Sequence, residues 1–386
     1  MKKIALFFYS CANLGDDLFI KVFAEHFYDC KIRLIANPRC VPSHLADNIK
    51  LHPHSFTNLL FGKMQSVFGE TSGLGKLAKR CNDLCFRLAA RMSDAYVYVG
   101  GSVFMEHAKG IPEIEFSAAE RPDFNVESAL QECGNSFVIG ANLGPVYSDT
   151  YWQEIRDVLG GYTHVCLRDW ASYSRVQDLS HVQYAPDVLF LVPEPQVFPK
   201  TENVVISVVD MSRHTVDEAV ISAYDRLLAD AVMAFSERKI PVTMVSFCEW
   251  EGDAKAIEKI LRMVPEGIEV SRLCYREDMQ QILDAIAGAT YVIGSRFHSM
   301  ILGISFGKPV YPIAYNCKTE HYLQDLNFSG RYANLSNLQS VTVEDVLYNY
   351  DNQIITDCTE HKKHAKNQFR TLRQFLQLKD GETVAP

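Results

Sequence analysis

The 386-residue sequence lacks any run of about 18 uninterrupted apolar residues, the length that a transmembrane helix requires. It also lacks an excess of basic residues, because 38 lysines and arginines stand against 47 aspartates and glutamates and give a net charge of −9. We therefore expect no membrane span and no general nucleic-acid-binding surface. An anionic ligand would have to be held by a few cations placed in a cleft.

Regular cysteine patterns are also missing. The eleven cysteines form no Cys-x-x-Cys pair, which favours small apolar side chains in a reducing compartment over a disulfide framework or a zinc site. Two close histidine pairs, His52 with His54 and His361 with His364, have no matching second pair to complete a ligand set. We therefore expect a cytoplasmic protein that needs no metal and no cofactor.

Short apolar segments alternate with helical segments along the chain. The predicted strands are Lys3–Tyr9, Ala95–Val99, Phe137–Ala141, Thr163–Leu167, Val204–Val209, Val242–Phe247, Tyr291–Ile293 and Pro309–Ile313. Continuous apolar strands between helices indicate an α/β protein with parallel sheets covered on both faces. The first segment is shorter than the apolar core of a signal peptide, about 7–15 residues, so we expect a strand there.

A cluster of three prolines between residues 193 and 199 interrupts this alternation and indicates a linker. The sequence thus predicts two Rossmann-like, doubly wound domains, residues 1–192 and 200–354, facing each other across a cleft. The carboxyl ends of the strands in both sheets would line that cleft. The last residues, 355–386, are predicted to form a helical tail that packs back onto the first domain.

The most informative segment is Ser295-Arg296-Phe297-His298-Ser299, between a predicted strand and an apolar helix. A strand-to-helix turn offers backbone N–H groups and the positive end of the helix dipole to an anion. Arg296 would add a bidentate donor, and His298 could deliver a proton to whatever Arg296 holds. The residues alone equally allow a structural interpretation, in which Arg296 pairs with a carboxylate and His298 caps the turn.

Further candidates follow the other predicted strands, at the edge where doubly wound sheets bind ligands. They are Asn13, Gly15, Asp16, Gly100, Gly101, Arg168, Asp187 and Lys318. The glycines permit a close approach of backbone or ligand. Each candidate also has a plain structural interpretation, such as helix capping for Asp16 and a salt bridge for Arg168.

Taken in chain order, several segments resemble the polysaccharide pyruvyl transferase family. The matching pieces are Asn13-Leu14-Gly15-Asp16, Gly100-Gly101-Ser102, Gly144-Pro145, Leu167-Arg168-Asp169 with Ser172, Pro186-Asp187, Ser295-Arg296-Phe297-His298-Ser299, Gly307-Lys308-Pro309-Val310 and Tyr315-Asn316-Cys317-Lys318. The resemblance implies a glycosyltransferase-B-like architecture. It also implies a reaction in which phosphoenolpyruvate is the donor substrate. Its carboxyvinyl unit would be transferred to two hydroxyls of a sugar in a polysaccharide or lipid-linked glycan, giving a pyruvate ketal.

This chemistry assigns expected roles to the candidates. Arg168, Arg296 and Lys318 would hold a donor that carries about three negative charges. His298 would protonate C3 of the donor, and Asp16 or Asp187 would accept a proton from a sugar hydroxyl. The remaining substrate-binding candidates are Ser295, Ser299, Asn13, Gly15, Gly100 and Gly101.

Two other functions stay open at this point. A nucleotide-sugar-dependent glycosyltransferase of the same fold usually holds the donor ribose with carboxylates of the second domain. Between Ser295 and Glu320 there is no acidic residue, which disfavours that enzyme. A non-catalytic sugar- or anion-binding protein would not need an acid and a base together.

The segment Leu59–Met92 lies outside the resemblance. Its second half, residues 76–91, has the pattern of a basic amphipathic helix, which is typical of a half-buried helix with a solvated basic face or of a helix that docks at a membrane surface. If the acceptor is lipid-linked, we expect peripheral contact with the inner face of the cytoplasmic membrane.

Overall fold

The structure is a computed structural model that describes residues 1–8, 12–38, 41, 46–69, 71–106, 134–196, 202–275 and 278–378. The last residue of the first predicted strand, Tyr9, lies outside the described residues. So do the third proline of the predicted linker, Pro199, and the end of the predicted tail, residues 379–386.

The first domain is built on a seven-stranded parallel sheet in the order β3-β2-β1-β4-β5-β6-β7. Its elements are β1 (Lys3–Phe8), α1 (Leu14–His26), β2 (Lys31–Ile35), β3 (Ile49–Leu51), α2 (His54–Phe68), α3 (Gly73–Arg91), β4 (Ala95–Val99), β5 (Ser136–Ala141), α5 (Asp149–Gly160), β6 (His164–Leu167), α6 (Trp170–Ser174) and β7 (Val182–Tyr184). Strands β4 and β5 are buried along their whole length because both faces of the sheet are covered. The strand order reverses between β1 and β4. Doubly wound sheets bind ligands beyond the carboxyl ends of the strands at such a point, and we call this region the crevice.

The second domain follows the short helix η1 (Val188–Leu191) and has a six-stranded parallel sheet in the order β10-β9-β8-β11-β12-β13. Its elements are β8 (Val204–Val208), η2 (Met211–Arg213), α7 (Glu218–Glu237), β9 (Val242–Ser246), α8 (Asp253–Leu261), β10 (Val270–Cys274), α9 (Met279–Gly288), β11 (Tyr291–Gly294), α10 (Phe297–Ser305), β12 (Val310–Ala314), α11 (Cys317–Asp325), β13 (Ala333–Asn334) and α12 (Val343–Asp351). The predicted two-domain α/β fold with parallel sheets is confirmed.

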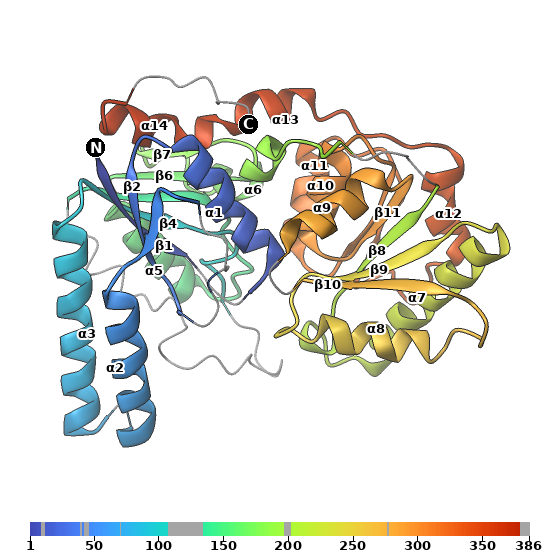
Figure 1. The fold of residues 1–386 in the computed structure, drawn as a ribbon, viewed down its shortest axis with the longest axis horizontal. Coiled ribbons are helices and arrows are strands. Elements are labelled where there is room, and N and C mark those ends of the chain that lie inside the picture. The colour runs from blue at the N-terminus through green and yellow to red at the C-terminus, as the bar shows by residue number, and fades with distance from the viewer. Residues whose placement is uncertain are drawn as a thin grey trace.

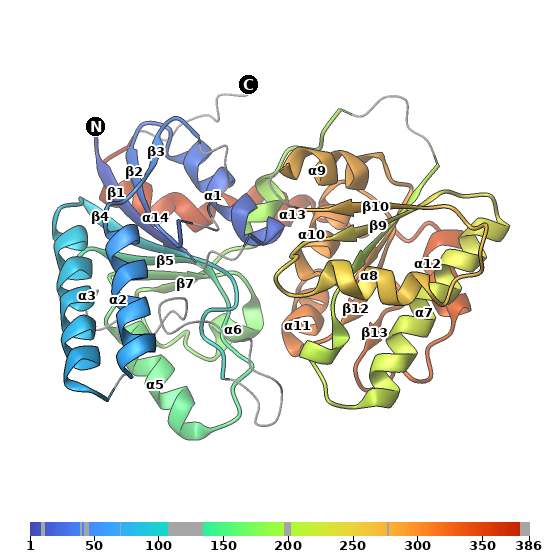
Figure 2. The ribbon, with the colours of Figure 1, turned by 60° about the horizontal axis from the view of Figure 1, so that its bottom comes forward.

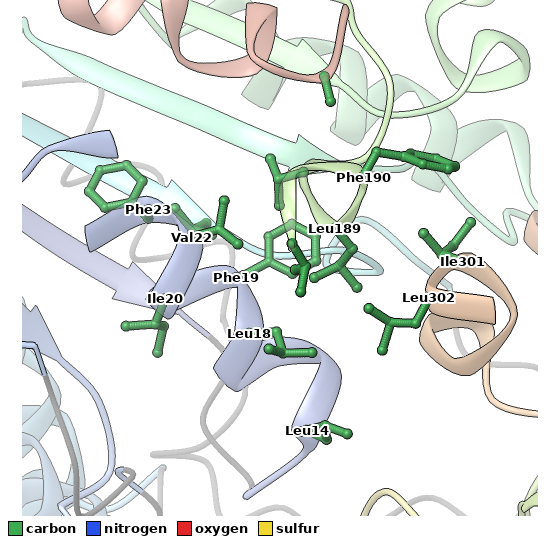
Figure 3. Close-up of a cluster of buried hydrophobic side chains, with 14 of the residues drawn as sticks. Leu14, Leu18, Phe19, Ile20, Val22, Phe23, Leu189, Phe190, Ile301 and Leu302 are labelled. Carbon is green, nitrogen blue, oxygen red and sulfur yellow. The ribbon is translucent and has the colours of Figure 1, made fainter. Parts of the chain in front are cut away.

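The two domains lie side by side and are joined by direct contacts (Figures 1 and 2). Close to the crevice, the backbone N–H of Leu14 donates to the carbonyl of Phe247 across the domain boundary at 3.1 Å. Apolar side chains of α1, η1 and α10 gather in one buried cluster (Figure 3). This packing sets the start of α1, in the first domain, close to the start of α10, in the second.

The C-terminal tail packs onto the first domain, as predicted, although it forms two helices rather than one: α13 (Thr359–Ala365) and α14 (Asn367–Phe375). From α14, the Gln368 side chain accepts a hydrogen bond from the Gly140 N–H at 3.0 Å and donates one to the carbonyl of Ala185 at 2.6 Å. The tail therefore returns from the second domain and packs against β5 and β6 of the first (Figure 1).

Helices α2 and α3 form an antiparallel hairpin on the side of the first domain that faces away from the second domain (Figures 1 and 2). Within the described ranges, no helix combines the length and the apolar character needed to cross a membrane.

Candidate functional site

The turn after β11 places His298 against the first turn of α1. A β-carbon at Gly15 would overlap the imidazole ring, so only glycine allows the two domains to meet at this distance. One helical turn further along α1, the Phe19 ring meets the same imidazole edge-on, with ring centroids 5.9 Å apart. His298 is therefore a group of the second domain that is held in place by the first.

Arg168, at the end of β6, lies next to His298. Its Nη1 donates to Asp187 at 2.9 Å and lies 3.5 Å from Nε2 of His298, while its Nη2 donates to Asn142 at 2.7 Å. A β-carbon at Gly101 would come within 2.7 Å of the guanidinium group. Arg168 is thus a buried, paired cation that touches the imidazole, and Gly101 leaves the space that it fills.

Lys318, in the first turn of α11, reaches from the second domain to the first. Its Nζ donates to the hydroxyl of Ser102 at 3.0 Å, and that hydroxyl donates to Asn142 at 3.1 Å. Because Asn142 also accepts from Arg168, a continuous chain of hydrogen bonds joins the two cations across the domain boundary. Burial, together with the charge of Arg168, lowers the pKa of Lys318 to about 8.

Asp16 follows Gly15 in the first turn of α1 and shares this environment. Burial, and then the charge of Glu251, raise the pKa of Asp16 to about 7, although Arg168 and Lys318 act in the opposite direction. An acid with this pKa exchanges its proton at neutral pH, which is the property that a general acid needs.

Arg296 is held by two acids from the turn that follows β9. Its Nε donates to Asp253 at 2.9 Å, Nη2 pairs with the same carboxylate, and Nη1 pairs with Glu251. The structural interpretation of Arg296, pairing with a carboxylate, is the arrangement found. Because all three guanidinium nitrogens already face carboxylates, Arg296 holds the turn that carries His298 instead of presenting an open fork to a ligand.

The protonation state of His298 differs from the one that the sequence suggested. Burial, and then the charges of Arg168, Lys318 and Arg296, hold the pKa of His298 well below its ordinary value. The imidazole is therefore neutral at pH 7 and accepts a proton more readily than it donates one. A neutral imidazole suits a base better than an acid, and the catalytic role of His298 stays a prediction.

Ser295 and Ser299 face the interior of the second domain. The Ser295 hydroxyl accepts a hydrogen bond from Tyr224 at 2.9 Å, and the Ser299 hydroxyl shares a short hydrogen bond with Ser207. Both serines are buried. They connect the turn to β8 and α7 and so support its shape.

The other candidates from the first domain also have structural partners. Asn13 caps α1, since its side chain accepts from the Gly15 N–H at 3.0 Å. Gly100 lies against the side chain of Val103. Asp187 is fully buried as the counter-ion of Arg168, so it is not placed to accept a proton from a substrate in the crevice.

Sequence reasoning missed several residues of the site. His214, after β8, stacks on Tyr315 with ring centroids 4.0 Å apart, and burial together with Arg296 lowers its pKa to about 3. Glu251, Asp253 and Asn142 were missed as well. All of them lie beyond the carboxyl ends of predicted strands, so a systematic inspection of every strand end would have found them.

The two arginines of the site leave little surplus side-chain charge. Arg168 is balanced by Asp187, and Arg296 by Asp253 and Glu251. Three helices, α1, α10 and α11, begin at the crevice, and α10 starts without a side-chain cap on its N–H groups. Their positive ends, together with Lys318, can hold a compact anion.

Comparison with known protein families matches residues 13–316 to the family described as polysaccharide pyruvyl transferase. A comparison with curated protein sequences gives no match.

Several solved structures have a similar fold. The UDP-GlcNAc 2-epimerase from Neisseria meningitidis, bound to UDP-GlcNAc, is 10% identical over 98% of this chain and 100% of its own, with a TM-score of 0.55. A putative UDP-N-acetylglucosamine 2-epimerase from Listeria monocytogenes is 9% identical over 100% and 99%, with a TM-score of 0.56. HepE from Anabaena, in complex with UDP-glucose, is 11% identical over 98% and 99%, with a TM-score of 0.55. At these identities the likeness shows the shared glycosyltransferase-B-like fold alone.

Proposed function

The chain belongs to the polysaccharide pyruvyl transferase family, and on that premise we propose that it transfers the pyruvyl unit of phosphoenolpyruvate to two hydroxyls of one sugar. The product would be a cyclic pyruvate ketal on a polysaccharide or lipid-linked glycan, and inorganic phosphate would be released.

One observation carries this proposal: at the crevice where three helices begin, His298 lies against Gly15, next to Asp16, and the charge of Lys318 acts on both. Phosphoenolpyruvate concentrates a carboxylate and a phosphate within a few atoms. Helix N-termini and a lysine suit such a donor, since both bind phosphate and carboxylate oxygens without needing a large surface.

The reaction needs one proton delivered and two protons removed. Asp16, with its raised pKa, is the group suited to donate a proton to C3 of the donor, which makes C2 electrophilic. Neutral His298 is suited to accept the proton of the first attacking hydroxyl. The second hydroxyl then attacks C2, the C2–O bond to phosphate breaks, and the second hydroxyl proton leaves with the phosphate. The two expected roles of Asp16 and His298 are thereby exchanged relative to the hypothesis drawn from the sequence.

The nearest rival function is transfer of a sugar from a nucleotide sugar. The sequence disfavoured it because no acid follows Ser295 before Glu320, but the structure brings Glu251 and Asp253 to the turn from β9. Both carboxylates are paired with Arg296 and Asp253 is fully buried, so they are not arranged to accept hydrogen bonds from a ribose.

Ligand-dependent thermal stability separates these functions. We expect phosphoenolpyruvate to raise the melting temperature, and UDP- and GDP-sugars to leave it unchanged, because only a ligand that binds the native state stabilises it. Release of phosphate from phosphoenolpyruvate in the presence of an acceptor glycan then distinguishes an enzyme from a non-catalytic binding protein. Stabilisation by a nucleotide sugar alone would contradict the proposal.

A further inference from the structure

The hairpin of α2 and α3 exposes an unusual amount of apolar surface. About half of the large apolar side chains that are exposed in the described part of the chain fall between Phe56 and Met92. Four of them lie at the end of the hairpin where the chain passes from α2 to α3, and we call this end the hairpin tip. They are Val67, Phe68, Leu74 and Leu77, with relative exposures of 76%, 46%, 49% and 55%. A soluble protein rarely gathers so many exposed apolar side chains at one projecting end unless a partner covers them.

The apolar surface continues from the tip along one side of α3. Leu74, Leu77, Leu84 and Leu88 are all about half exposed, and their spacing of three, seven and four residues places them on one face of a helix. A different side of α3, about a quarter turn around the helix from this stripe, is the one that packs, since Ala78 and Ala89 are buried. The exposed stripe is therefore not the side by which the helix joins its own domain.

Basic residues surround this apolar surface. Near the tip, the exposed cations are Lys63, Lys76, Lys79 and Arg80. Residues 54–92 contain six lysines and arginines against two acidic residues, a net charge of +4 in a chain whose total is −9. Positive charge is thus concentrated on the hairpin while the remainder of the molecule is strongly acidic.

A projecting apolar tip with lysines and arginines near it is a surface that fits an anionic lipid bilayer. Apolar side chains enter the region between headgroups and acyl chains, and lysines and arginines remain at the level of the lipid phosphates. We propose that the hairpin tip docks the protein on a membrane that contains anionic lipids. A second copy of this chain fits less well, because two hairpins of charge +4 would repel each other where they met.

The position of the hairpin agrees with this partner. It extends from the first domain on the side away from the second domain, where no other part of the described chain covers it (Figures 1 and 2). Docking through this end leaves the crevice between the domains uncovered, and the inference does not depend on which reaction takes place in that crevice.

Flotation of the full-length protein with lipid vesicles tests the proposal. We expect binding to vesicles that contain phosphatidylglycerol and none to vesicles of phosphatidylcholine alone, with binding weakened by salt. Replacing two tip cations, K76E with R80E, should weaken binding by at least about twentyfold, since each surface cation contributes about fivefold. Replacing two apolar tip residues, V67S with L77S, should also weaken it.

The matched control reverses two exposed cations outside the hairpin, K255E with R370E, and should bind vesicles like the unchanged protein. An unchanged melting temperature in all variants shows that the fold is intact. Equal binding to neutral vesicles, an equal loss in the control, or no binding to either vesicle would overturn the proposal. So would a dimer that V67S with L77S converts to a monomer, because the tip would then be covered by a second copy.

Discussion

The imidazole of His298 occupies the space that a β-carbon of residue 15 would take, although the two residues belong to different domains. This contact requires the two domains to lie against each other. The hydrogen bond from the Leu14 N–H to the carbonyl of Phe247 has the same requirement. The site is therefore a property of the assembled pair of domains, and Gly15 is the position at which the smallest change should disturb it most.

Replacing Gly15 by alanine is expected to lower kcat by about 100-fold, because displacement of a reacting group by about 1 Å has costs of this size. G160A is the matched control, since a β-carbon there meets nothing within 4 Å. Steady-state kinetics of both variants test this expectation. Normal turnover in G15A would show that His298 does not need its place against α1.

Replacing Asp16 by asparagine removes the proposed acid. We expect kcat to fall by about 100- to 10,000-fold, the range typical of a lost general acid. In the unchanged enzyme, kcat/KM should decline as pH rises through about 7, following the pKa of Asp16. The control D149N changes another first-turn acid, on α5, and should retain the pH profile of the unchanged enzyme.

The same residue predicts how stability depends on pH. Because the pKa of Asp16 is raised from 3.8 to about 7 in the folded protein, folding takes up a proton between these values, and the free energy of unfolding falls as pH rises through this window. Above about pH 7 the stabilisation that the protonated Asp16 gave is fully lost. D16N should therefore melt at a higher temperature than the unchanged protein at about pH 8 and at a similar temperature at about pH 4. A difference that is larger in acid would contradict the raised pKa.

Replacing Arg296 by lysine keeps the charge but offers one ammonium group where three guanidinium nitrogens face Asp253 and Glu251. Removing one partner of a buried ion pair outright costs about 3–5 kcal/mol of stability, so urea unfolding should show a loss of stability that does not exceed this range. kcat should fall as well, because the turn that carries His298 loses its support. Unchanged stability together with a raised KM for the donor would instead show that Arg296 binds the donor directly.

Lys318 provides the contrast, because its Nζ donates to the neutral hydroxyl of Ser102, whereas Arg296 donates to carboxylates. The variant K318Q should raise the KM for phosphoenolpyruvate by about tenfold or more, as expected for a lost hydrogen bond to a charged group. Its free energy of unfolding should change little. Measuring KM and urea unfolding for K318Q and R296K in parallel separates cations that bind the donor from cations that support the site.

Sequence reasoning found the strands that are buried on both sides, because these are continuous apolar runs. The predicted strand Ala95–Val99 agrees with β4 at both ends. It missed β10, an edge strand that is exposed along most of its length, because such a strand needs no apolar pattern. It also missed β2, whose apolar residues alternate with Lys31 and Arg33, and the short strands β3, β7 and β13.

The candidate site was located from local signals, but its partners were not. The turn from Ser295 to Ser299 is visible in the sequence as a strand followed by an apolar helix. The acids that bind Arg296 lie 43 and 45 residues earlier in the chain, and nothing in the local sequence connects them. The pKa of His298 likewise depends on burial and on Arg168 from the other domain, so its neutral state could only follow from the fold.

The most direct test is a mass spectrum of the acceptor glycan after incubation with the protein and phosphoenolpyruvate in heavy water. Protonation of C3 followed by attack of two hydroxyls predicts an acceptor that has gained one pyruvate ketal with a single deuteron in its methyl group, and H298A should give none of it. An acceptor that carries an intact vinyl group, a sugar added from a nucleotide donor, or a ketal formed equally well by H298A would contradict the mechanism proposed for this crevice.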